Sequence, residues 1–189
     1  MFPTRLPLLA TTALAIAAVA APAAQAGSKA HTAQANTCGA VDSRPGEISS
    51  SDLRDATLCL LNIERESHGK SALRSNGTLA KVATRYSRQM VDAKFFDHVS
   101  PGGSSLTQRV RKTSYLKGAR SWALGENLAW GTGNLATPRE TVDGWMNSPG
   151  HRANILNGKF RDIGIGIAEG TPRNDLSGAT YTTNFGRRS

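Results

Sequence analysis

The chain has 189 residues, of which 39% are hydrophobic and 20% charged, and a formal net charge of +9 at pH 7. This length suits one globular domain with its own core, and after residue 26 no segment is apolar for long enough to cross a bilayer. The positive charge indicates loose attraction to anionic wall polymers or lipid head groups. Without a recognition motif it does not indicate specific binding of nucleic acid.

The N-terminus has the pattern of a secretory signal peptide. Arg5 is the only charged residue before Lys29, residues 6–24 are almost wholly apolar, and residues 24–26 (Ala-Gln-Ala) offer a small-residue cleavage site. We prefer a signal peptide to a membrane anchor because the apolar stretch is rich in alanine and interrupted by proline. The sequence therefore predicts a cleaved signal over residues 1–26 and a secreted, extracellular protein, with association to the cell wall left open.

An arm and one pair of cysteines follow the predicted signal. Residues 27–50 are rich in Ser, Ala, Gly and Pro and predict a flexible arm ahead of a domain over residues 51–189. In an exported protein an even number of cysteines indicates a disulfide, here between Cys38 and Cys59. Such a bond would tie the arm to the first helix. The alternative is two free thiols, with Cys59 buried.

Helices are predicted where apolar residues recur at helical spacing behind a capping residue. The expected helices cover residues 52–68 after a cap at Ser51 or Asp52, a stretch from Asn76-Gly77 to about residues 95–96, a short basic helix from Ser104 or Ser105, a helix after Thr137-Pro138, and a turn from Ser148 through Leu156.

Strands are predicted between and after these helices, over residues 127–130, 163–168 and 180–185. The order of helices first, then strands mixed with helices, predicts an α+β domain with a mainly antiparallel sheet.

Two histidines and one glutamate are the candidate site residues. His98 follows a helix, and His151 lies at a predicted helix N-terminus, where the helix dipole favours the neutral imidazole. A neutral imidazole can bind a metal or accept a proton. Glu126 begins a predicted strand, and the three residues come from separate elements, so only the fold can bring them together. From spacing alone, a structural role is the better explanation of each histidine. His31 and His68 are expected to face solvent.

Familiar catalytic patterns are absent from the sequence. There is no His-Glu-x-x-His helix, no Gly-x-Ser-x-Gly elbow and no phosphate-binding glycine loop. The cysteines are better explained by a disulfide than by a nucleophile. The lack of a recognisable nucleophile favours a binding protein over an enzyme.

One stretch is locally basic. Arg109, Arg111, Lys112, Lys117 and Arg120 occur with no acidic residue between Asp97 and Glu126. We favour a solvated surface for this stretch, and a docking patch for an anionic surface is the alternative.

At its candidate site residues the chain resembles the CAP superfamily, which comprises cysteine-rich secretory proteins, antigen 5 and pathogenesis-related proteins, and it is most similar to the bacterial branch. The matching runs appear in family order over about residues 52–186. They are Leu61–Arg65 with its Asn-x-x-Arg pattern, Leu73 and Leu79-Ala80, Phe96–Pro101, Gly125–Ala129, Gly144–Leu156 and Tyr181–Gly186.

The resemblance implies a three-layer α-β-α sandwich with an open cleft, on whose floor His98, Glu126 and His151 would converge. Two imidazoles and a carboxylate can hold zinc or another divalent cation and leave one position open. The eukaryotic pattern has a second glutamate where this chain has Ser148, and Glu140 does not match that position. A weaker metal site and a cleft that binds its ligand without metal are both open, and Ser148 has its own explanation as a helix cap.

The resemblance also implies structural roles for other signature residues. Trp145, Leu128 and Trp130 would be core. Asn62 and Arg65 would satisfy buried backbone groups or pair with a carboxylate, and Asn154 would satisfy a loop.

Three functions compete at this point. The first is a secreted, monomeric module that binds a small molecule or lipid in the cleft. The second is a metal-dependent hydrolase of peptide or wall polymer, with His98, His151 and Glu126 holding the metal. The third is a wall-associated protein that acts through Arg109, Arg111 and Lys112. We rank them in this order.

Overall fold

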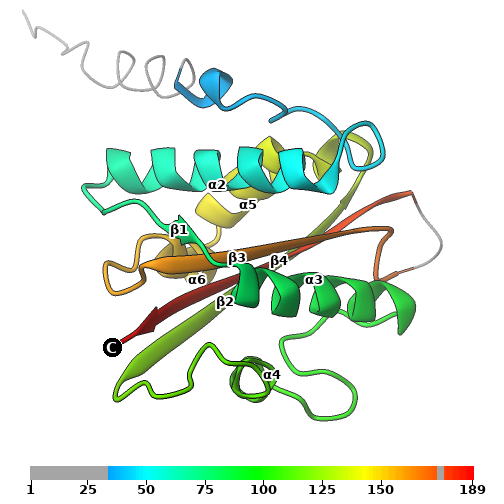
Figure 1. Cartoon of the computed structure of the whole chain (residues 1–189). Helices are drawn as coiled ribbons and strands as arrows, with labels where there is room; N and C mark the ends of the chain where they lie inside the picture. The colour runs from blue at the N-terminus through cyan, green and yellow to red at the C-terminus, as the bar shows by residue number, and fades with distance from the viewer. Residues whose placement is uncertain (1–33, 174–176) are drawn as a thin grey trace, which may run out of the picture.

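The computed structural model describes residues 34–173 and 177–189 (Figure 1). The predicted signal peptide, His31 and the first part of the predicted arm lie outside the described residues. The helices are η1 (Asn36–Cys38), α2 (Ser50–Ser67), α3 (Gly77–Asp92), α4 (Leu106–Arg111), η2 (Gly133–Ala136), α5 (Pro138–Met146) and α6 (Pro149–Ile155). The strands are β1 (Arg74–Ser75), β2 (Trp122–Thr132), β3 (Asp162–Glu169) and β4 (Gly178–Arg188).

The four strands form one sheet in the order β1-β3-β4-β2. Strand β4 pairs antiparallel with both β2 and β3, and only the two-residue β1 is parallel to its neighbour. The predicted sheet is thus confirmed as mainly antiparallel. The register places Glu126 of β2 directly opposite Asn184 of β4.

Helices cover both faces of the sheet, which gives the three-layer α-β-α sandwich. Helices α2, α5 and α6 lie on one face, and α3 and α4 lie on the other (Figure 1). Trp145, Leu61 and Phe185 belong to the core under the first layer, while Leu79 and Val110 belong to the core under the second. Within the described residues, no helix combines the length and the apolar character needed to span a membrane.

The helix starts follow the local capping chemistry. Asn76, Ser105 and Thr137 accept hydrogen bonds from backbone N–H groups at the starts of α3, α4 and α5, as expected for these caps. Helix α2 begins slightly earlier than predicted, because Ser49 is its cap rather than Ser51 or Asp52.

Helix α3 ends at Asp92, before the predicted end near residues 95–96. Lys94 has a φ of +52°, and the Phe95 N–H donates to the Met90 carbonyl. The chain therefore turns out of the helix here even though the apolar periodicity continues to Phe95.

Glycines in β3 let α3 lie directly on the sheet. A Cβ on Gly166 would stand 2.1 Å from the Thr84 backbone nitrogen, and one on Gly164 would stand 2.1 Å from the Ala80 backbone nitrogen. No side chain fits at these two positions while the helix stays where it is. The alternation of glycine and isoleucine over residues 164–167 thus serves packing, because it lets α3 lie close over the sheet.

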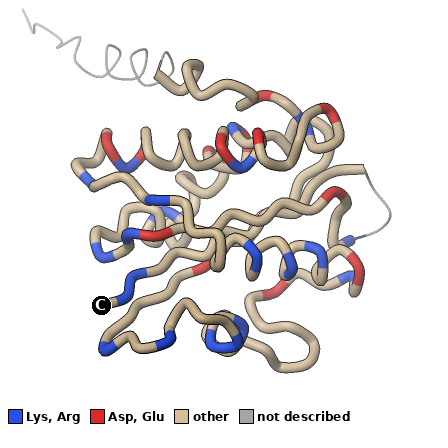
Figure 2. The backbone as a smooth tube through the Cα atoms, in the orientation of Figure 1, with Lys and Arg blue, Asp and Glu red and all other residues tan. Residues whose placement is uncertain are grey.

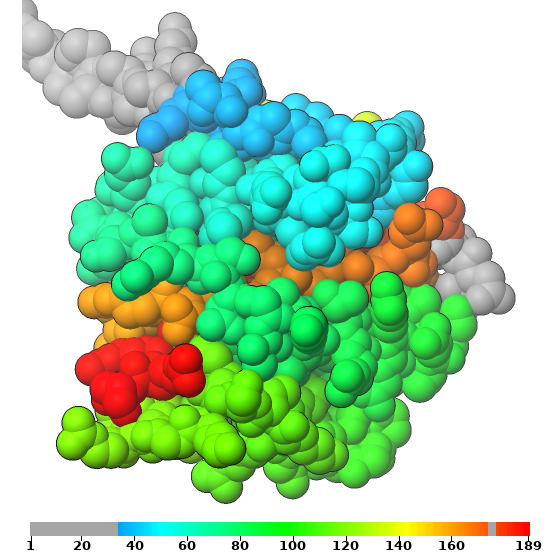
Figure 3. Space-filling view, viewed as in Figure 1, coloured from blue at the N-terminus to red at the C-terminus, as the bar shows by residue number. Residues whose placement is uncertain are grey.

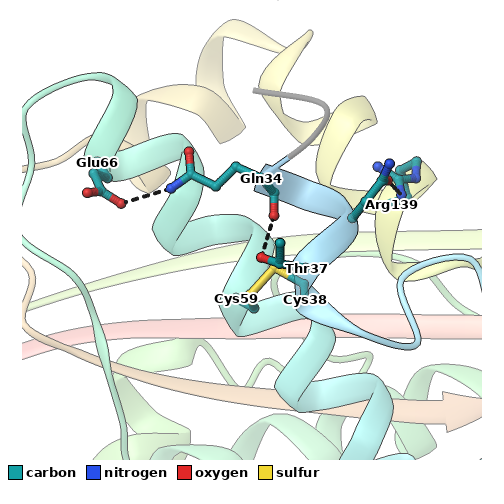
Figure 4. The surroundings of a disulfide bond; sticks show 7 residues. Gln34, Thr37, Cys38, Cys59, Glu66 and Arg139 are labelled. Atoms are coloured by element: carbon teal, nitrogen blue, oxygen red, sulfur yellow. Dashed lines mark hydrogen bonds between the residues drawn. A yellow bond between two sulfur atoms is a disulfide. The ribbon is translucent and has the colours of Figure 1, made fainter. Parts of the chain in front are cut away.

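The disulfide between Cys38 and Cys59 is confirmed, with the two Cα atoms 5.6 Å apart. It joins η1 to α2, as the close view in Figure 4 shows, and Gln34 of the arm donates to Glu66 further along α2. The described part of the arm lies against the domain (Figure 3). Its Val41 is buried, and its Asp42 pairs with Arg139 at 2.7 Å.

Two signature residues of α2 satisfy backbone groups. Asn62 donates to the Leu73 carbonyl at 3.1 Å and accepts from the Leu73 N–H at 2.8 Å. Arg65 is fully buried and donates to the carbonyls of Ser71 and Ile155 at 2.8 and 2.5 Å. Of the two roles left open for Asn62 and Arg65, the structure shows the pairing with backbone.

Candidate functional site

The site centres on the buried carboxylate of Glu126. Its side chain is 3% exposed, and its Oε1 lies 2.9 Å from Nδ1 of His98, whose side chain is 56% exposed. An ionised carboxylate only accepts hydrogen bonds, so Nδ1 of His98 carries the proton and Nε2 faces away from this bond. The structure therefore brings together two of the three predicted site residues, one from β2 and one from the loop after α3.

Neighbouring residues fix the place of Glu126 and His98. Gly125 precedes the glutamate, and a Cβ there would stand 2.8 Å from the ring of Phe160 and 3.1 Å from Oδ1 of Asn154. Beside His98, the Asp97 side chain accepts from the Val99 N–H at 2.9 Å, and the Asp97 carbonyl accepts from the Tyr86 hydroxyl at 2.6 Å. The residues next to Glu126 and those next to His98 thus fix the positions of these two side chains.

Arg109 completes the surroundings of the carboxylate. Its guanidinium donates to Oε2 of Glu126 at 2.6 Å, and its side chain is only 10% exposed. The same guanidinium also donates to the carbonyls of His98 and Ser104, and lies 3.4 Å from the centre of the Tyr86 ring. A buried ion pair of this kind, stacked on an aromatic face, holds loop, helix and strand in one arrangement.

The sequence interpretation of Arg109 was therefore wrong. We grouped it with Arg111 and Lys112 in a basic surface patch, but its guanidinium points into the site. The missed signal was Glu126 itself, because a carboxylate in a buried strand needs a cation or several donors nearby. The stretch with no acidic residue before Glu126 was the obvious source of that cation.

Asn184 supplies a third donor to the carboxylate. With its side-chain amide turned as its neighbours require, the amide donates to Oε2 of Glu126 at 3.1 Å and accepts from the Ala83 N–H at 3.2 Å. Asn184 is fully buried and lies opposite Glu126 in the sheet register. Each carboxylate oxygen thus has at least one donor. The sequence analysis did not name Asn184, and it named Arg109 only as part of a basic surface.

His151 lies beside this cluster and is not among the residues that bond to the Glu126 carboxylate in the described part of the chain. It is the third residue of α6, and that helix is held on β2 by amides. Asn127 donates to the His151 carbonyl at 3.1 Å, and Asn154 donates to the Glu126 carbonyl at 3.1 Å and to Oδ1 of Asn127 at 2.9 Å. Asn154 was expected to satisfy a loop, but it joins a helix to the strand that carries Glu126.

The arrangement does not fit a metal centre. Among residues 34–173 and 177–189, no group of three or more His, Cys, Asp and Glu side chains is placed to hold a metal ion. Glu126 already pairs with Arg109 and accepts from His98. A cation would have to displace a guanidinium at 2.6 Å from the only buried carboxylate of the candidate set. The zinc or other divalent cation of the sequence analysis stays a prediction that this geometry does not support.

The two imidazoles differ in their electrostatics. The hydrogen bond that His98 donates to Glu126 raises the pKa of His98 above its usual value of 6.5, against the opposing effect of partial burial. Burial lowers the pKa of His151 below 6.5, and the nearby His98 lowers it further. The helix dipole was our reason to expect a neutral His151, whereas burial is the main cause here.

An open groove runs beside His151 along β2, η2 and α5. Its volume is about 350 Å³, and it is lined by Leu128, Ala129, Trp130, Leu135, Glu140, Thr141, Gly144, Trp145, Ser148 and His151. Two exposed apolar side chains are among the lining residues, Trp130 at 36% and Leu135 at 64%. The groove therefore has both apolar and polar lining residues, and we call the part formed by Ser148 and His151 at the start of α6 its polar end.

Two residues that line the groove, Trp130 and Ser148, differ from what the sequence predicted. We predicted Trp130 as core together with Leu128 and Trp145, but only the latter two are buried. Trp130 lies on the edge strand β2, where one face stays open. Ser148 does occupy the N-cap position of α6, but its side chain makes no capping hydrogen bond.

A fold of this class, an α-β-α sandwich with a histidine-glutamate cluster at the edge of its sheet, matches known proteins. The sequence model of the cysteine-rich secretory protein (CAP) family matches residues 58–185. The chain therefore belongs to the CAP family, as its sequence motifs indicated.

Bacterial proteins are among its relatives. The chain is 39% identical over 126 residues to YkwD of Bacillus subtilis, described as an uncharacterized protein, covering 67% of this chain and 44% of YkwD. It is 31% identical over 131 residues to YlbC of the same organism, described as an uncharacterized membrane protein, covering 69% of this chain and 33% of YlbC. The chain thus spans less than half of either relative.

Solved structures share the fold. An extracellular SCP-domain protein of Bacillus anthracis is 28% identical with a TM-score of 0.55, covering 73% of this chain and 43% of that one. An outer surface protein of Borrelia burgdorferi is 22% identical with a TM-score of 0.63, covering 75% and 97%. The second likeness concerns the fold alone.

Proposed function

We propose that this is a secreted CAP-domain protein that binds a small amphipathic molecule, such as a fatty acid or sterol, in the groove beside His151. The observation that carries the proposal is the pairing of exposed Trp130 and Leu135 with a polar end at His151 in one groove. Ligand sites are typically concave and mostly apolar, with a few polar groups that orient the ligand.

The polar end suits the head group of such a ligand. His151 and Ser148 offer neutral hydrogen-bonding groups, and Glu140 lies at the same groove. Burial favours the neutral form of His151 by lowering its pKa. The engaged Glu126 and Arg109 keep the neighbouring floor fixed, so the groove needs little reorganisation to receive a ligand.

Export is part of the same proposal. The Cys38–Cys59 disulfide fits an oxidising compartment, and the relative from Bacillus anthracis is described as extracellular. N-terminal sequencing of the protein recovered from culture medium or cell wall tests this. A first residue of Gly27 is expected, and an intact Met1 in that fraction would contradict cleavage.

A titration with the fluorescent fatty acid cis-parinaric acid tests ligand binding. Saturable binding is expected, and Trp130→Ala should weaken it about tenfold through loss of the aromatic contact. Trp122→Ala is the matched control, since Trp122 lies on the same strand at 41% exposure but outside the groove, and it should change the affinity by less than about twofold. Absence of saturable binding of both this probe and a fluorescent sterol would contradict the proposal.

We do not propose a metal-dependent hydrolase as a second function. It needs Glu126 as a metal ligand, and this carboxylate is occupied by Arg109, His98 and Asn184. No observation in the described part of the chain favours it over binding.

A further inference from the structure

A second hollow of the molecule, whose lining residues differ from those of the groove beside His151, is lined by cations. It lies between α2 and α3, has a volume of about 420 Å³, and is lined by Arg54, Ala80, Lys81, Thr84, Arg85 and Arg88. Figure 2 shows Lys and Arg gathered along α3, and in Figure 3 atoms of β3 (orange) remain visible between α2 (cyan) and α3 (green). We call this hollow the basic groove.

The four cations of the basic groove have no counter-charge in the described residues. Arg54, Lys81, Arg85 and Arg88 make no ion pair or side-chain hydrogen bond there, unlike Arg109 and Arg139, which pair with carboxylates. No acidic side chain lines the groove. Outside the described residues, positions 1–33 contain no Asp or Glu, and positions 174–176 contain a single acidic residue, Asp175. Four unpaired cations in one hollow repel one another, and an anion bound there would relieve this.

The cations are arranged in a row rather than around a point. Lys81, Arg85 and Arg88 follow one another along a single face of α3, over about 10 Å of helix axis. Arg54 lines the groove from α2, and the small side chains of Ala80 and Thr84 on α3 complete the lining. A ligand with one phosphate would meet only part of this row, whereas a chain with repeating charges can follow it.

The lining also distinguishes among polyanions. Proteins that bind single-stranded nucleic acid stack bases on aromatic side chains, and the basic groove has no aromatic residue. Surfaces that bind anionic membranes commonly add apolar side chains that enter the bilayer, and the only apolar side chain here is Ala80. A chain of phosphodiesters on a flexible polyol backbone needs neither feature.

We infer that the basic groove between α2 and α3 is a docking site for a linear polyol-phosphate polymer, the kind of anionic chain found in bacterial cell walls. This moves the wall contact of the sequence analysis from Arg109, Arg111 and Lys112 on α4 to Arg54, Lys81, Arg85 and Arg88. The site is separate from the ligand groove beside His151, so either proposal can fail alone.

Binding of labelled poly(glycerol phosphate) to the full domain, followed by fluorescence anisotropy at several salt concentrations, tests the inference. The triple variant K81Q/R85Q/R88Q should bind about tenfold more weakly or worse, and the slope of log affinity against log salt should fall by about 2 because three phosphate contacts are lost. The matched control R111Q/K117Q/R120Q removes the same charge from another surface and should stay within about twofold of the unchanged protein. Circular dichroism verifies that both variants are folded.

Two results would overturn the inference. Equal losses in the two triple variants would mean that net charge alone attracts the polymer. Vesicles containing phosphatidylglycerol and the oligonucleotide oligo(dT) serve as further probes, and both should bind more weakly than the polymer. Tighter binding of either probe, lost in K81Q/R85Q/R88Q, would assign the groove to a membrane or to nucleic acid instead.

Discussion

Arg109 and Glu126 form the one ion pair in the described residues whose two side chains are both nearly buried. Removing one partner of such a pair leaves a charge without compensation in a place that water hardly reaches. The pair is thus a structural requirement of the site, and a metal ion on Glu126 would have to displace the Arg109 guanidinium.

Replacing Arg109 tests this role. Arg109→Gln should lower the free energy of unfolding by about 3 kcal/mol, because Glu126 keeps its burial and loses its cation. Arg120→Gln, at an exposed position nearby in sequence, should change it by less than about 0.5 kcal/mol. Chemical denaturation of both variants measures the difference. Equal effects would show that Arg109 is as dispensable as a surface cation.

His98 and His151 should make the stability of the fold depend on pH in opposite ways. Glu126 raises the pKa of His98 above 6.5, so this contact stabilises the fold below pH 6.5 and its contribution is lost as the pH rises through the raised value. His151 behaves oppositely, since its lowered pKa makes its protonation below pH 6.5 unfavourable to the fold. Near pH 6.5 the charged form is therefore favoured at His98, and the neutral form is favoured at His151.

Titration of the imidazole signals by NMR checks this order. His98 should titrate above 6.5 and His151 below it, and Glu126→Gln should move His98 back toward 6.5. The charged groups that face His98 are Glu126, Asp97 and Arg109, so this variant removes the largest of several influences. A reversed order of the two histidines would contradict the geometry.

The sequence predicted only some of the residues of the site. His98 and Glu126 were predicted together because their motifs resemble those of a family, and the structure places them in contact. Arg109 and Asn184 could not be found this way, since a pattern of spacing does not tell which cation turns inward. Trp130 was assigned to the core by its type, but its place on an edge strand leaves it exposed.

The helices were predicted more completely than the side-chain contacts of the site. Local capping chemistry and periodicity located α2 to α6, since a cap such as Asn76 or Thr137 acts within a few residues. The two-residue β1 was not predicted, because its pairing with β3 depends on a long-range contact and carries no periodicity. The end of α3 was misplaced because Phe95 continues its apolar stripe beyond the last helical turn.

The contact of α3 with β3 can be tested at one glycine. Gly166→Ala places a methyl group 2.1 Å from the α3 backbone, so the helix must move away and the free energy of unfolding should fall by about 2 kcal/mol. Gly77→Ala is the control at the start of the same helix, where a Cβ meets nothing within 4 Å, and it should cost nothing or stabilise slightly. Thermal and urea unfolding compare them. A Gly166→Ala variant as stable as the control would argue against this close approach.

At the scale of the whole molecule, the disulfide and the contacts of the arm join the N-terminal residues to the sandwich. The arm was predicted to be flexible because its composition lacks the pattern of a helix or strand. Composition does not show that Val41 is buried or that Asp42 pairs with Arg139. Composition alone could not foresee contacts made with residues almost a hundred positions away.

Removal of the disulfide measures what it contributes. The variant C38S/C59S should lose about 3 kcal/mol of stability, since the bond closes a loop with a sequence separation of 21. Denaturation under non-reducing conditions measures this, with the wild-type protein in reductant as a parallel sample. A loss below about 1 kcal/mol would show that the arm stays docked without the bond and that the unfolded chain gains little freedom.

We propose that the groove beside His151, and not a metal on His98, Glu126 and His151, is the functional feature of this domain. A crystal structure of the exported protein, purified without chelator and grown with zinc and a fatty acid, tests this proposal. We expect lipid density along Trp130 and Leu135 with its head group at His151, and Arg109 still paired with Glu126. A zinc ion bound by Glu126 and both histidines, with Arg109 displaced and the groove empty of lipid, would contradict it.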